Sequence, residues 1–201
     1  MNDDVAVAAT LLARGAEILD EVGITLPNVI TEPAAFVAML AGDPALAERH
    51  LRGAYDSLRR MGEQANLATS AALLAQTIAA QGSQRYDEAE TLIAISRQAG
   101  DGQDLTAQTI GNGVQARILA ARGQLRESVA MAEAATQLAA QTDLLSQHGD
   151  ALRDQAHVLV TAGLIEQALE SIQQALRLYE AKGNQPYARA CFRFLAQYGS
   201  P

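Results

Sequence analysis

The residues of this chain with the greatest capacity for chemistry are three histidines and a single cysteine. His50, His148 and His157 are far apart in sequence and lack the short spacing of zinc ligands, both with one another and with Cys191. Cys191 stands between an alanine and a phenylalanine, which indicates a buried structural thiol. A nucleophilic cysteine needs a nearby histidine or a helix N-terminus, and the sequence supplies neither. We therefore predict no metal site and no nucleophilic cysteine.

The acidic and glycine-rich motifs also point away from catalysis. Asp87, Glu88 and Glu90 fall at the start of an expected helix, where carboxylates stabilise the helix dipole. The segment 111–113 (Gly-Asn-Gly) lacks the preceding strand and the third glycine of a dinucleotide-binding motif, so it predicts a kink or a close contact within a helix. We expect a protein that is not an enzyme and that has no cofactor.

Small residues recur about every forty positions, and they indicate the helices that must position any functional side chain. These residues are Ala8, Ala47, Ala89, Ser128 and Ala168. Four positions after each come Leu12, Leu51, Ile93, Ala132 and Ile172, and seven positions after each come Gly15, Ala54, Ser96, Ala135 and Ala175. Offsets of four and seven lie on one face of an α-helix. Two helices per period of this length are typical of an α-solenoid.

We predict an all-α fold of about ten helices, an α-solenoid of antiparallel helix pairs in which residues 1–201 form a single repeat array. The parts are degenerate N-terminal helices at 4–41, helix-pair repeats at 31–61, 66–98, 105–140 and 144–181, and a C-terminal capping helix at 186–197. The predicted N-caps are Thr31, Asp43, Asp104 and Asp143.

Within each pair the pattern resembles the tetratricopeptide repeat, which has a small residue in its first helix and a glycine at the turn. The small first-helix residues are Ala35, Ala75, Ala116 and Ala156, and the turn glycines are Gly42, Gly82, Gly123 and Gly163. Small residues are needed where two helices cross at close distance. The chain departs from the family because its units are longer than about 34 residues, large aromatics are mostly absent, and Gln115 and Gln155 occupy a usually apolar position.

The segments 41–44, 85–90 and 105–109 also resemble the C-terminal repeat region of large bacterial, particularly actinobacterial, signalling proteins. Those proteins couple a nucleotide-cyclase or DNA-binding output domain to a regulatory ATPase and then to such repeats. The sequence contains no Gly-x-x-x-x-Gly-Lys-Ser/Thr phosphate-binding loop and no basic helix-turn-helix. The resemblance therefore implies that this chain carries the repeat end of such a protein.

The tetratricopeptide resemblance further implies that a partner binds a concave groove lined by the first helices. The residues that map to this groove are Glu32, Phe36, Thr69, Gln76, Arg117, Arg153 and His157. Of these, Arg117, Arg153 and His157 form a basic cluster in an otherwise acidic protein, which suits an acidic peptide or a terminal carboxylate. The alternative is that all of them are ordinary exposed side chains.

Composition and charge narrow the class of function. A net charge of −8 argues against nucleic-acid and anionic-membrane partners. One cysteine fits a reducing compartment, and the N-terminus lacks the basic start of a secretory signal, so a cytoplasmic location is expected. The preferred hypothesis is a non-catalytic scaffold that binds a protein or peptide and regulates a bacterial signalling protein. The alternative, a small-molecule effector-sensing domain of a transcriptional or cyclase regulator, requires an enclosed apolar pocket of about 300 Å³ or more, and aromatic residues to line it are scarce.

The N-terminal helix carries the second-helix stripe with no first helix before it. Val5, Leu11, Leu12 and Ile18 would then form an apolar patch with a strong tendency to associate. We predict that the isolated chain forms a homodimer through this helix, or that preceding sequence of a longer parent protein packs there.

Overall fold

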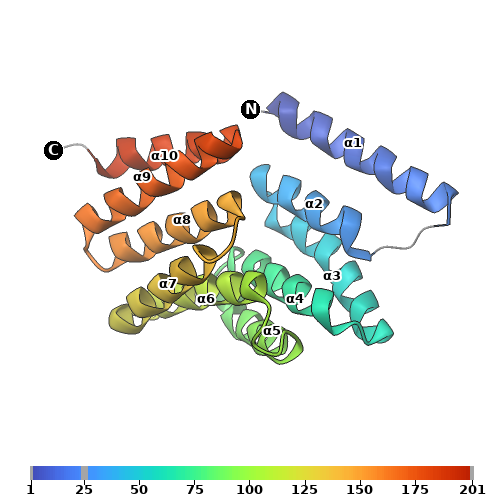
Figure 1. Ribbon diagram of the computed structural model, residues 1–201, viewed down its shortest axis with the longest axis horizontal. Coiled ribbons are helices and arrows are strands. Elements are labelled where there is room, and N and C mark those ends of the chain that lie inside the picture. Colours follow the sequence, from blue (N-terminus) through green and yellow to red (C-terminus); the bar gives the residue numbers. More distant parts are fainter. Residues whose placement is uncertain (1, 24–26, 200–201) are drawn as a thin grey trace. The chain divides into compact units, whose positions relative to one another are not determined.

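The computed structural model describes residues 2–23 and 27–199, and for residues 2–5 and 27–28 it describes the backbone alone. This part of the chain is all-α, with ten α-helices, one short 3-10 helix and no strand (Figure 1). The elements are α1 (Asn2–Glu21), α2 (Pro27–Leu40), α3 (Pro44–Met61), α4 (Gln64–Ala79), η1 (Ser83–Arg85), α5 (Tyr86–Ala99), α6 (Leu105–Ala121), α7 (Leu125–Ala139), α8 (Leu145–Thr161), α9 (Ile165–Lys182) and α10 (Gln185–Tyr198). The prediction of an all-α fold built from helix pairs is confirmed.

The chain forms two compact units, Met1–Ala107 and Gln108–Pro201, and the division falls within the first turn of α6. In the first unit, α1 packs against α2, α2 against α3, α3 against α4, and α4 against α5. In the second unit, α7 packs against α8, α8 against α9, and α9 against α10. The prediction that all 201 residues form one array stays a prediction.

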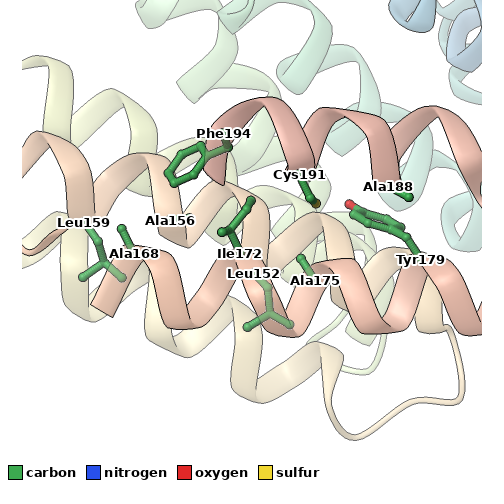
Figure 2. Packing of buried hydrophobic residues seen from close by; sticks show 10 residues of the cluster. All are labelled: Leu152, Ala156, Leu159, Ala168, Ile172, Ala175, Tyr179, Ala188, Cys191 and Phe194. Atoms are coloured by element: carbon green, nitrogen blue, oxygen red, sulfur yellow. The ribbon is translucent and has the colours of Figure 1, made fainter. Parts of the chain in front are cut away.

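The small-residue columns form the core of both units. The even-numbered helices take the role of first helix and the odd-numbered helices that of second helix. In α3, α5, α7 and α9 the recurring residues of the second helices, at the first small position and four and seven positions after it, are all buried. The small residues of the first helices, Ala35, Ala75, Ala116 and Ala156, are buried as well. The Ser96 hydroxyl of α5 donates to the backbone carbonyl of Ala68 in α4 at 2.7 Å, which shows how closely the helices approach. Figure 2 shows the same arrangement in α8 to α10.

Several helix ends form as predicted. An Asp43 carboxylate oxygen accepts from the Leu46 backbone N–H at 2.8 Å, and Asp104 accepts from the Ala107 N–H at 2.9 Å. The turn glycines Gly123 and Gly163 both have φ of 78°, a left-handed conformation that favours glycine.

Two of the predicted N-caps are wrong. Helix α2 begins at Pro27, so Thr31 lies within the helix; the fixed φ of proline suits the first helical position and allows this earlier start. Helix α8 begins at Leu145 with Leu144 at its N-cap, so Asp143 lies before the cap. The hydroxyl of Thr142 accepts from the N–H of Leu144 at 3.3 Å, and Leu144 makes no side-chain capping hydrogen bond to the helix.

In the first unit an ion-pair network joins α3 to η1 and α5. The Glu48 carboxylate of α3 accepts from Arg85 at 2.9 Å and from Arg52 at 2.8 Å, and both arginines also pair with Glu88 of α5. The Glu48 side chain is only 13% exposed. Hydrogen bonds, chiefly from Arg85, lower the pKa of Glu48 to about 2.

Replacing Glu48 by glutamine is expected to lower the free energy of unfolding at pH 7 by about 1–2 kcal/mol, because two arginines lose their shared carboxylate. The folded-state pKa of Glu48 lies below its unfolded value of 4.5, so its stabilising effect is present above pH 4.5 and is lost as the pH falls toward about 2. Urea unfolding at pH 7 and at pH 3 should therefore show a smaller difference from wild type at pH 3. Glu21→Gln, which removes an exposed pair with Arg14 at 3.9 Å, is the control. An equal deficit at both pH values would contradict the role of the Glu48 charge.

Candidate functional site

The seven residues predicted for the partner-binding groove divide between the two units. Glu32 and Phe36 lie on α2, and Thr69 and Gln76 lie on α4, in the first unit. Arg117 lies on α6, and Arg153 and His157 lie on α8, in the second unit.

In the first unit the predicted residues make contacts between successive first helices. The Ser70 hydroxyl of α4 donates to Glu32 of α2 at 2.9 Å, and burial raises the pKa of this carboxyl group although the hydrogen bond opposes the rise. The Thr69 hydroxyl donates at 2.8 Å to Asp104, the residue that caps α6. Phe36 is 41% exposed. Glu32 and Thr69 therefore link helices to one another, whatever else they bind.

In the second unit the predicted residues come together on one face of α8. Asp150, Arg153, Asp154 and His157 follow the i, i+3, i+4, i+7 spacing that aligns side chains along a helix. Arg117 approaches this face from α6 and pairs with Asp154. We call these five residues the α8 polar cluster.

The pair between Arg117 and Asp154 joins a half-exposed cation to a nearly buried anion. Arg117 Nη1 lies 3.3 Å from Asp154 Oδ1, and the two side chains are 49% and 8% exposed. Because water reaches one side of Arg117 while Asp154 holds the other, the guanidinium is oriented and still accessible.

Arg153 is held by an acid and an aromatic ring. Its guanidinium carbon lies 4.3 Å from the centre of the Tyr187 ring of α10, a cation–π distance, and Nη2 lies 3.7 Å from Asp150 Oδ1. The Tyr179 hydroxyl of α9 donates to the same Asp150 oxygen at 2.6 Å, and the rings of Tyr179 and Tyr187 stack at 5.3 Å. Three helices therefore meet at this point.

Tyr179 can reach Asp150 because position 149 is a glycine. A Cβ atom at Gly149 would lie 2.8 Å from a ring carbon of Tyr179, closer than two carbon atoms can approach. The ring is completely buried and lies beside Ala188 and Cys191 of α10 (Figure 2). Gly149 therefore leaves the space that the tyrosine ring occupies.

Burial determines the protonation of the cluster. It raises the pKa of Tyr179, raises that of Tyr187 to about 12 and raises that of the Cys191 thiol to about 11, so all three keep their protons at neutral pH. Burial, followed by the charge of Arg117, lowers the pKa of His157, so its imidazole is neutral at pH 7. Burial also raises the pKa of Asp150, against the opposing effect of Arg153. These groups are suited to donating and accepting hydrogen bonds rather than to nucleophilic attack.

Sequence reasoning missed four residues of this site: Asp150, Asp154, Tyr179 and Tyr187. The structure places Arg117, Arg153 and His157 in a cluster of mixed charge, since the two arginines face two carboxyl groups. The pairing of Arg153 with Asp150 could have been predicted, because Asp150 stands three positions before Arg153 on one helix. The tyrosines belong to other helices, and no spacing along α8 could have identified them.

Among the residues whose side chains are described, no three His, Cys, Asp or Glu side chains are placed to share a metal ion. None of the described helices is both long enough and apolar enough to cross a membrane. No protein-family model and no curated protein sequence matches this chain.

Proposed function

We propose that this chain is a non-catalytic helical-repeat scaffold that binds a protein or peptide partner through the α8 polar cluster. The observation that carries the proposal is the half-exposed guanidinium of Arg117, which the nearly buried Asp154 holds in place. A side chain that is already ordered loses less conformational entropy when a ligand binds, so its hydrogen bonds contribute more to affinity.

The chemistry of the cluster suits a peptide that offers both acceptors and donors. The Arg117 guanidinium can donate to a carboxylate or to backbone carbonyls, and the neutral His157 imidazole can accept from a backbone amide. Because Asp150 and Asp154 already balance the two arginines, affinity would come from directed hydrogen bonds more than from net charge.

The cellular role belongs to the same proposal. The resemblance of the repeats to the C-terminal region of bacterial signalling proteins supports a regulatory module, and the single cysteine is consistent with the cytoplasm. In this role the partner would be a segment of a signalling protein, docked but not chemically altered.

A peptide that binds the wild-type chain can be selected from a random display library. Arg117→Ala is expected to raise the Kd of this peptide by about tenfold or more, because a charge-assisted hydrogen bond contributes about 1.5–3 kcal/mol. Calorimetric titration of the synthetic peptide gives the Kd. Arg126→Ala, which removes an exposed arginine from the second helix α7, should bind as tightly as wild type.

A second variant separates binding from folding. The double variant Arg117→Ala/Asp154→Asn removes both charges, so no nearly buried carboxylate is left alone, and it should bind as weakly as Arg117→Ala. The proposal fails if the library yields no binder, or if the Arg117 and Arg126 variants bind equally well.

A further inference from the structure

One side of α1 is mostly apolar and exposed, and Arg14, which pairs with Glu17, is a charged residue on it. Leu11 is 67% exposed and Ile18 is 46% exposed, and Val7 and Val22 on the same side are exposed as well. The adjoining side, which includes Gly15, contacts α2: a Cβ atom at Gly15 would lie 3.3 Å from the end of the Ile30 side chain. Helix α1 therefore has one packed side and, next to it, a mostly apolar side that is open to solvent.

The exposed side of α1 is the side that faces the preceding first helix in other repeats. Leu11 stands three positions after Ala8, the first small residue of the repeat pattern in α1. Met131 in α7 and Ser171 in α9 stand three positions after the equivalent residues of their own helices. Met131 packs against a buried cluster that includes Ala116 and Ala120 of the first helix α6. The Ser171 hydroxyl donates to Gln155 of the first helix α8 at 3.4 Å. By position, Leu11 faces the place of a preceding first helix.

Helix α10 exposes the complementary face. Ala196 stands forty positions after Ala156 and continues the first-helix column, and Phe192 stands forty positions after Leu152. Leu152 and Ala156 are buried against the following second helix, α9 (Figure 2). In α10 both equivalents are exposed, Phe192 by 53%, because this helix packs on α9 through other residues. Helix α10 is thus a first helix whose face for a following second helix is open.

Charge favours pairing of these two faces. Helix α10 carries Arg189 and Arg193 and no acidic residue. The C-terminal half of α1 carries three exposed carboxylates, Glu17, Asp20 and Glu21, against one arginine, Arg14, and so keeps a net negative charge. In the α8–α9 pair, Gly149 lies against the ring of Tyr179. In the repeat pattern, Arg189 of α10 is equivalent to Gly149, and Leu19 of α1 is equivalent to Tyr179. That register would place Arg189 beside the acidic half of α1. Two copies of α1, by contrast, would bring like charges together.

We propose that this chain assembles head to tail, with α10 of one copy packed on α1 of the next to complete a helix pair like α8–α9. The two faces are different surfaces, so the contact is heterologous and each copy keeps one free end. The mass of the assembly therefore rises with concentration past that of a dimer until a ring closes. This inference does not depend on the proposed peptide-binding function.

Sedimentation velocity over a concentration series tests the assembly. Wild type should exceed the mass of a dimer, whereas Leu11→Glu/Ile18→Glu and Phe192→Glu/Ala196→Glu should each remain monomeric. Because the first variant keeps an intact α10 and the second an intact α1, an equimolar mixture should form a heterodimer and grow no further. All four substituted side chains are exposed, and circular dichroism checks that each variant is folded. Leu144→Glu, which alters an exposed leucine outside both faces, should assemble like wild type.

Three results would each overturn the inference. Wild type that stays monomeric at every concentration shows that the two faces do not associate. A Phe192→Glu/Ala196→Glu variant that still dimerises shows that α1 pairs with itself or with another surface. Two variants that remain monomeric after mixing show that α10 and α1 are not each other's partners.

Discussion

Replacing Tyr179 by alanine is expected to lower the free energy of unfolding by about 3–5 kcal/mol, the cost of removing a large aromatic side chain from a core. The side chain is completely buried, its ring stacks on Tyr187, and its hydroxyl donates to Asp150 at 2.6 Å. Urea unfolding followed by circular dichroism measures the loss.

The hydroxyl group can be tested separately from the ring. Tyr179→Phe keeps the ring and leaves the Asp150 carboxyl group without this donor, so we expect a loss of about 1–2 kcal/mol. Tyr198→Phe is the matched control, because its hydroxyl bonds to Gln197 at an exposed site of α10 and should contribute little. If Tyr179→Ala and Tyr198→Phe unfold at the same urea concentration, Tyr179 does not hold the three helices together.

Ala156→Leu is expected to destabilise the protein by about 1–3 kcal/mol through overpacking. Ala156 is completely buried between α8 and α9, next to Ala168 and Ile172, and a leucine there would force the two helices apart (Figure 2). Ala116→Leu should behave similarly, since it occupies the same column in α6.

The matched control for these substitutions is Ala121→Leu, at an exposed site at the end of α6, which should be nearly neutral. Urea midpoints of the three variants decide the matter. Equal midpoints would mean that the column of small residues does not mark the helix crossings, and the alignment of the repeats would then be wrong.

The helix pairs could be predicted from the sequence because their signal is steric and local. A small residue at a crossing point is required by close approach, so Ala47, Ala89 and Ala168 mark their helices wherever the pairs lie. The N-caps were predicted less well, because a helix can begin one or more residues away from the polar residue that could cap it. Helix α8, for example, begins at Leu145 with Leu144 at its N-cap, one position after Asp143.

The site was predicted less well because its contacts depend on packing between helices. Asp150 and Tyr179 are 29 residues apart and meet only because Gly149 leaves space for the ring. Arg117 and Asp154 are 37 residues apart, and their pairing requires α6 to lie beside α8. Spacing within one helix predicts which side chains share a face, but it does not predict which side chains of other helices reach that face.

The ion pair between Arg117 and Asp154 has a mechanical consequence. It joins α6 to α8, and the same guanidinium is the group through which a ligand would be held. A ligand that draws Arg117 away removes this tie and leaves a nearly buried carboxylate without its cation, which is costly. A partner bound through Arg117 would therefore loosen the contact between α6 and α8 that the ion pair makes.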